Sequence, residues 1–167
     1  MQRSENLVKE NHFRIEQATW RDLGPIRAVE RACFDEDAWP LLDMLAALTF
    51  PDVVRLKAVL GEQVVGFAGG DIRRTQRIGW ITTLGVLPEF RRQGIATALL
   101  LASEEALGQS RVRLCVRRSN SGAISLFYKY GYLQMGVWPA YYTDREDALV
   151  LEKNLGKKPG AGVPQNS

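Results

Sequence analysis

Residues 83–97 read TLGVLPEFRRQGIAT, and their pattern predicts a strand that enters a turn and continues directly into a helix. The first turn of a helix leaves several backbone N–H groups unpaired and carries a partial positive charge. Gly94 and Ala96 are small enough to let an anion approach that backbone, and Arg91 and Arg92 add positive charge. The stretch therefore predicts a phosphate-binding turn. The alternative is an ordinary strand–helix connection whose arginines are merely solvated.

Hydrophobic periodicity on both sides of this stretch predicts an alternation of strands and helices. The expected strands cover residues 13–17, 53–60, 63–72, 77–86, 112–116, 132–142 and 148–152. The expected helices cover residues 23–33, 41–50, 92–107 and a short segment between 119 and 131. Gly61 and Glu62 form a tight turn that joins two strands into a hairpin. This order is typical of a mixed α/β sheet with helices on its faces.

The chain has 167 residues, which suits a single domain, expected here at residues 12–155 with flexible tails at 1–11 and 156–167. Its net charge of +3 and its pI of about 9.0 favour an anionic ligand in a local basic patch over a nucleic-acid partner. One histidine and two distant cysteines do not indicate a metal site. Without a signal peptide or an apolar run of ~20 residues, we expect a soluble, cytoplasmic protein.

The segment Arg91-Arg92-Gln93-Gly94-Ile95-Ala96 resembles the Gln/Arg-x-x-Gly-x-Gly/Ala signature of the GNAT acetyltransferases. Asn120-Ser-Gly-Ala123 and Leu126-Phe127, followed by Gly131-Tyr132, resemble a second element of that family. The resemblance implies a mostly antiparallel sheet of about seven strands with helices on both faces, and acetyl-CoA as co-substrate with no metal. The cofactor-binding residues that it implies are Leu84, Gly85, Val86, Arg91, Arg92, Gln93, Gly94, Ile95, Ala96, Thr97, Asn120 and Phe127.

Further segments resemble RimI-type enzymes, which acetylate the N-terminus of a ribosomal protein. They are Cys33-Phe34 with Ala38-Trp39-Pro40, Tyr141-Tyr142, and residues 145–148, which read REDA. The resemblance implies a protein or peptide N-terminus as substrate, bound by Phe34, Trp39, Tyr141 and Tyr142, and a monomer or weak dimer without nucleic-acid or membrane partners. The alternative for Tyr141 and Tyr142 is that they pack at the rim of the site without contacting substrate. The acidic residues 35–37 either attract the substrate's ammonium group or form a solvated loop.

The chain departs from this family at the positions of its acid and base. Cys115 stands where RimI-type enzymes have a general-base glutamate, and Phe127 stands where they have a general-acid tyrosine. Tyr128 is one residue further on, so its side chain is turned by about a hundred degrees around the helix. Strand alternation places Cys115 on one face with Arg113 and Arg117, whose charges would lower the thiol pKa and favour a thiolate base. The alternative is a buried, inert cysteine.

These departures leave three functions open. The first is an enzyme that transfers an acetyl group to a protein α-amine. About a tenth of such amines is neutral at pH 7, against a few parts in ten thousand for lysine, so this substrate tolerates a weak base best. The second is an acetyltransferase for a small amine, such as a polyamine or aminoglycoside. The third is a non-catalytic acyl-CoA-binding or regulatory module.

Overall fold

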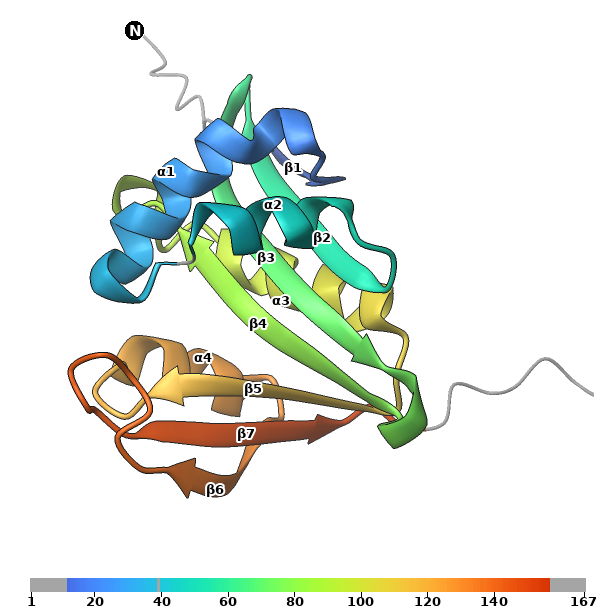
Figure 1. Cartoon of the computed structure of the whole chain (residues 1–167), viewed down its shortest axis with the longest axis vertical. Coiled ribbons are helices and arrows are strands. Elements are labelled where there is room, and N and C mark those ends of the chain that lie inside the picture. The colour runs from blue at the N-terminus through green and yellow to red at the C-terminus, as the bar shows by residue number, and fades with distance from the viewer. Residues whose placement is uncertain (1–11, 39, 157–167) are drawn as a thin grey trace, which may run out of the picture.

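A computed structural model describes residues 12–38 and 40–156 as one seven-stranded sheet with helices on both faces (Figure 1). The strand order is β1-β2-β3-β4-β5-β7-β6, and neighbours are antiparallel except for β4 and β5. This is the mixed, mostly antiparallel sheet that the sequence led us to expect. The strands are β1 (Phe13–Gln17), β2 (Val53–Leu60), β3 (Gln63–Arg73), β4 (Ile78–Val86), β5 (Arg111–Arg117), β6 (Leu133–Trp138) and β7 (Ala148–Asn154).

Two helices cover each face of the sheet. In Figure 1, α1 and α2 lie in front of the sheet and α3 and α4 lie behind it. The α-helices are α1 (Leu23–Phe34), α2 (Leu41–Thr49), α3 (Ile95–Leu107) and α4 (Ser121–Lys129). Short 3-10 turns are η1 (Trp20–Asp22), η2 (Asp35–Asp37), η3 (Arg74–Gln76) and η4 (Pro88–Phe90).

Two of the expected boundaries were wrong, both for reasons of local backbone geometry. Helix α3 begins at Ile95 instead of residue 92, because Arg92 and Gly94 have φ values of 62° and 81°, outside the right-handed helical region. Strand β6 ends at Trp138 instead of residue 142, and Ala140 follows with a φ of 48°. The expected hairpin between β2 and β3 is confirmed, with Leu60 paired to Gln63. Apart from Gly156, the expected tails lie outside the described residues.

A β-bulge in β4 opens the sheet in its middle. Ile81 pairs with Gly70 and Thr83 pairs with Gly69, so Thr82 is an extra residue without a partner on β3. On the other side, β4 pairs with β5 only over Ile78–Ile81 and Arg111–Leu114. A bulge bends the strand that carries it and increases its twist. The second half of β4 therefore separates from β5, and a gap opens between the two halves of the sheet.

Glycines in β3 and β4 allow α3 to pack closely against the back of the sheet. A Cβ atom added to Gly79 would lie 2.9 Å from the Cβ of Leu107, and one added to Gly66 would lie 3.0 Å from Cδ1 of Leu99. Leu99 and Leu107 are both fully buried. The position of α3, and with it the turn at its N-terminus, therefore depends on these small residues.

Gly79→Ala should lower the free energy of unfolding by about 1–3 kcal/mol, because the new methyl group forces Leu107 or the backbone to move. Urea denaturation monitored by circular dichroism measures the loss. Gly136→Ala is the matched control, because Gly136 also lies in a strand but has no atom within 4 Å of an added Cβ. Equal stabilities of the two variants would contradict the close packing of α3 on β4.

Candidate active site

A cleft of about 960 Å³ lies where β4 and β5 separate. Its walls come from α1, the second half of β4, the end of β5, the start of α4 and the segment between β6 and β7. The structure thus brings together residues that are more than a hundred positions apart in the sequence. Of the residues singled out from the sequence, the cleft is lined by Phe34, Leu84, Cys115, Asn120, Phe127, Tyr141 and Tyr142.

The backbone of β4 presents hydrogen-bonding groups to this cleft. In an antiparallel pair, successive residues alternate between bonding to the partner strand and facing away from it. Leu87 donates its N–H to the carbonyl of Val65 on the β3 side, so the N–H groups of Leu84 and Val86 point away from β3, toward the side on which β5 has separated. Of the two residues, Leu84 lines the cleft. The Val86 carbonyl accepts hydrogen bonds from Cys33 Sγ at 3.3 Å and from Arg91 Nε at 3.1 Å. The N–H groups of Leu84 and Val86 are therefore placed to stabilise a developing oxyanion.

The turn before α3 has the form of an anion site. Gly94 caps the helix with a φ of 81°. A Cβ atom added to Gly94 would have no other atom within 4 Å. The backbone N–H groups of the first turn, up to Thr97, face outward without partners inside the helix. Ile95 can contribute only its backbone, since its side chain is buried. Arg91 is turned away from this site toward Val86, so of the two predicted arginines only Arg92 remains beside the turn.

Cys115 faces the cleft on the same side of β5 as Arg113 and Arg117, as strand alternation predicted. The expectation that these arginines lower the pKa of the Cys115 thiol was nevertheless wrong. Arg113 is paired with Glu152, and Arg117 is paired with three carboxylates. Burial raises the pKa of Cys115 to about 11. The side chain is therefore a neutral thiol at pH 7, and the structure gives no support for a thiolate there.

The two aromatic residues of α4 have different surroundings. Phe127 is 5% exposed and contributes to the cleft wall. Tyr128 is 46% exposed and is not part of the cleft lining, because the next residue of a helix points about a hundred degrees away. Asn120 caps α4 by accepting a hydrogen bond from the N–H of Ala123 at 3.1 Å. A proton relay through Tyr128 therefore has no geometric support in this structure.

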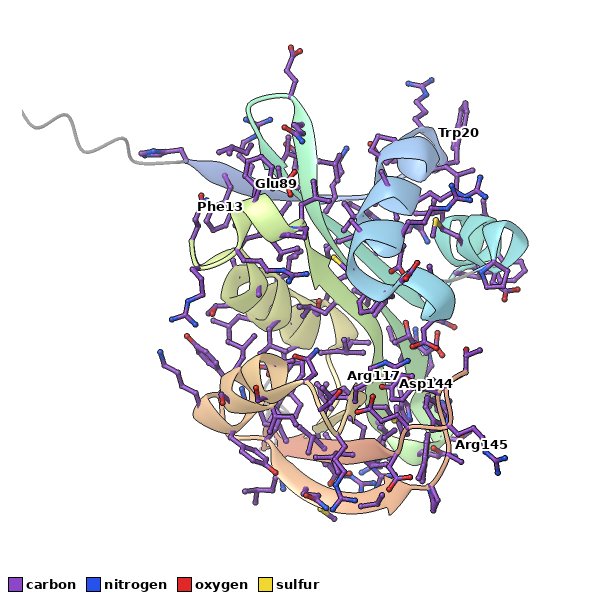
Figure 2. All side chains as sticks on the ribbon, turned by 90° about the vertical axis from the view of Figure 1, so that its left-hand side faces the viewer. Phe13, Trp20, Glu89, Arg117, Asp144 and Arg145 are labelled. Atoms are coloured by element: carbon purple, nitrogen blue, oxygen red, sulfur yellow. The ribbon has the colours of Figure 1, made fainter. Side chains whose placement is uncertain are left out.

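Arg117 joins the two segments that border the open end of the cleft. Its Nε and Nη2 bond to Asp37 after α1, and its Nη1 bonds to Asp144 at 2.9 Å and Glu146 at 2.7 Å before β7. Figure 2 shows Arg117 and Asp144 lying together, with Arg145 pointing outward. Thr143 also donates its hydroxyl to Asp37 at 2.9 Å. Although burial opposes it, these hydrogen bonds hold the pKa of Asp37 below its ordinary value. We call Asp37, Arg117, Thr143, Asp144 and Glu146 the clasp.

Aromatic side chains form the wall of the cleft next to the clasp. The rings of Trp80 and Trp138 stack with centroids 5.8 Å apart, and Trp138 lies 5.4 Å from Tyr141. Tyr142 packs edge-on against Tyr141. The guanidinium of Arg117 lies over the ring of Tyr142, with 4.2 Å between Arg117 Cζ and the ring centroid. Burial raises the pKa of Tyr142 above its ordinary value. Phe34 lies on the opposite side of the cleft, and Trp39 lies outside the described residues.

The structure adds Glu30, which sequence analysis missed. This residue of α1 lines the cleft, is only 2% exposed, and accepts a hydrogen bond from Thr83 Oγ1 at 2.5 Å. A signal was present in the sequence: Glu30 follows Ile26 by four residues and therefore lies on the buried face of its helix. A carboxylate on such a face requires a partner or a function.

Two features are absent from the part of the chain that the structure describes. Its His, Cys, Asp and Glu side chains form no group of three or more that could hold a metal ion. None of its helices has both the length and the apolar character needed to cross a membrane. Both cysteines are free and half-buried.

Comparison with known proteins agrees with this geometry. Residues 13–132 match the model of the acetyltransferase (GNAT) family. The catalytic subunit of the N-terminal acetyltransferase A complex from Arabidopsis thaliana is 32% identical over 86% of this chain and 79% of its own length. An N-alpha-acetyltransferase from Sulfurisphaera tokodaii is 30% identical over 88% of this chain and 96% of its own length. The structure of the ribosomal-protein-S18-alanine N-acetyltransferase from Escherichia coli has a TM-score of 0.80 at 22% identity, covering 91% of this chain and 99% of that one.

The fold, with a cleft between two diverging strands, is that of an acyltransferase. The chain belongs to the GNAT acetyltransferase family. It is an acetyl-CoA-dependent N-acetyltransferase.

The raised pKa of Cys115 leads to a prediction about pH. Reaction of Cys115 with iodoacetamide in a Cys33→Ser background should stay slow at pH 7 and rise with pH toward 11, since only the thiolate reacts. Cys115→Ser should change turnover less than about threefold, because a neutral thiol accepts no proton. Alkylation that is complete at pH 7, together with a tenfold loss of turnover in Cys115→Ser, would restore the thiolate hypothesis.

Proposed function

We propose that this enzyme acetylates the N-terminal α-amine of a protein. Relatives that match most of the chain are named for α-amine acetylation, which supports this acceptor. The cleft adds a second line of support. Tyr141, Tyr142 and Phe34 form opposite sides of an opening that suits an extended chain end, and the clasp borders it with carboxylates. The acceptor would then enter between these residues, with its amine directed toward β4.

The chemistry would be a direct attack of the free amine on the thioester carbon of acetyl-CoA. The N–H groups of Leu84 and Val86, which face the cleft, would stabilise the oxyanion of the tetrahedral intermediate. The phosphates would lie on the backbone N–H groups from Gly94 to Thr97, with Arg92 and Gln93 beside them. Gly85, Asn120 and Phe127 would border the remaining length of the cofactor.

The electrostatics of the cleft favour an ammonium-bearing acceptor. Asp35 and the carboxylates of the clasp outnumber the two arginines of the cleft, Arg73 and Arg117, which raises the local concentration of cations. An α-amine also needs less help with its proton than lysine does, because its reference pKa near 8 leaves about a tenth of it neutral at pH 7. Both effects favour an α-amine as the acceptor.

Acetyl-CoA should raise the melting temperature of the wild-type protein, because a ligand that binds only the folded state stabilises it. Gly94→Glu should abolish this rise, since its carboxylate would occupy the open space at the start of α3 and repel the phosphates. Thermal scans with and without acetyl-CoA measure the effect. Gly108→Ala is the control: it carries the same left-handed strain, with a φ of 60°, at the opposite end of the helix, and should keep the full rise. A full rise in Gly94→Glu would refute the assigned phosphate site.

A peptide with a free N-terminus and no lysine should be acetylated at least about a hundredfold faster at pH 7 than the same peptide with a blocked N-terminus and one lysine. The reason is the difference in neutral fraction between the two amines. The ratio of rates should shrink above pH 8, because the neutral fraction of the α-amine then rises by less than about twofold per pH unit, whereas that of lysine still rises nearly tenfold. Release of CoA measures both rates. Equal rates at pH 7, or turnover of spermidine but of no peptide, would reject the proposal.

A further inference from the structure

Two glutamates are buried in the part of the chain that the structure describes, and their surroundings differ. Glu104 is bonded to Tyr132 Oη at 2.9 Å and to Lys153 Nζ at 2.8 Å, outside the cleft. Its charge is therefore compensated by a structural ion pair. Glu30 has the Thr83 hydroxyl as hydrogen-bond donor and contributes to the cleft lining. A buried carboxylate at a reaction cleft is a common arrangement for a general base.

The hydrogen bond with Thr83 places Glu30 beside the reacting centre. Thr83 directly follows the bulge at Thr82 and directly precedes Leu84, whose N–H faces the cleft. Helix α1 contacts the strand along this stretch, because a Cβ atom added to Gly85 would lie 3.0 Å from Cys33 Sγ, one turn after Glu30. The carboxylate therefore lies next to the backbone that would hold the thioester oxygen.

Other groups around the cleft are poorly suited to take a proton. Cys115 is a neutral thiol, and burial raises the pKa of Tyr141 and Tyr142. Tyr128 lies outside the cleft. From these positions we propose that Glu30 is the catalytic base, which accepts the proton of the attacking amine while Thr83 holds its carboxylate in place.

The surroundings of Glu30 suit this role. Thr83 from β4 donates a hydrogen bond to it, and Cys33 on its own helix interacts with it electrostatically. The guanidinium of Arg91 lies 4.0 Å from Cys33 Sγ. Across the cleft, β5 presents Cys115 and Arg117, and the charge of Arg117 is compensated by the carboxylates of the clasp. Arg73 at the end of β3 also lines the cleft, where its guanidinium lies over the ring of Trp80.

The proposed step moves one proton from the acceptor amine to the CoA sulfur through Glu30. The amine nitrogen forms a bond to the carbonyl carbon of acetyl-CoA, and the π electrons move to the oxygen, where the Leu84 and Val86 N–H groups stabilise them. The nitrogen transfers its proton to Glu30. The intermediate then collapses, the C–S bond breaks, and the CoA sulfur takes the proton from Glu30. The products are the acetylated amine and CoA, with Glu30 ionised again.

Glu30→Gln tests this role, because a glutamine can still accept the Thr83 hydrogen bond but cannot take a proton. We expect kcat at pH 7 to fall about a hundredfold, within the range of general-base loss. The rise of melting temperature with acetyl-CoA should persist. The loss should shrink toward pH 9, where the free amine deprotonates by itself. Glu104→Gln is the matched control: it removes the other buried carboxylate and should lower stability while keeping the wild-type pH profile.

Thr83→Val provides a second test that does not depend on how well Glu30→Gln folds. A hydrogen bond to an ionised carboxylate lowers its pKa, so removal of the Thr83 hydroxyl should raise the pKa of Glu30. The acidic limb of kcat/KM should then move to higher pH. Wild-type turnover in a folded Glu30→Gln, or an unmoved acidic limb in Thr83→Val, would overturn the proposal. Both tests can use whichever amine the enzyme accepts best, so their outcome is independent of the α-amine proposal.

Discussion

The bulge at Thr82 is the constraint on which the architecture of the site depends. Up to Ile81 the parallel pairing with β5 holds the two halves of the sheet together, and beyond it the strands diverge. The divergence creates the cleft and exposes one edge of the β4 backbone inside the protein. An exposed strand edge in a protein interior would ordinarily be costly. In the function proposed above, the amide groups of acetyl-CoA would pair with this edge.

An opening in the sheet requires a substitute connection between its halves. The clasp supplies it: Arg117 at the end of β5 binds Asp37 from the first half and Asp144 and Glu146 from the second. The clasp is only partly buried, since the side chain of Asp144 is 54% exposed. It connects the two segments that border the opening. The same pairing engages Arg117 with carboxylates, while burial raises the pKa of the Cys115 thiol.

The absence of the family's glutamate and tyrosine, replaced by Cys115 and Phe127, leaves the backbone features of the cleft unchanged. The proposed oxyanion site consists of backbone groups of β4, so substitutions at Cys115 and Phe127 would leave it intact. The proposed phosphate site would also consist of backbone groups, at the start of α3. A carboxylate from α1 can approach the same reacting centre from the opposite wall, because α1 packs directly on the stretch that follows the bulge. Side-chain changes on β5 therefore alter only one wall of the cleft.

The sequence by itself determined the features that depend on nearby residues: the order of strands and helices, the hairpin at Gly61, the connection from β4 into α3, and the faces of β5. It did not determine where charged side chains find their partners. Arg117 meets Asp37 across 80 positions, Glu30 meets Thr83 across 53, and Arg91 turns to the Val86 carbonyl instead of to the predicted phosphate site. Periodicity and propensity act within one or two turns of chain, whereas these contacts, and the pKa of Cys115 that follows from burial, exist only after the sheet has assembled around its bulge.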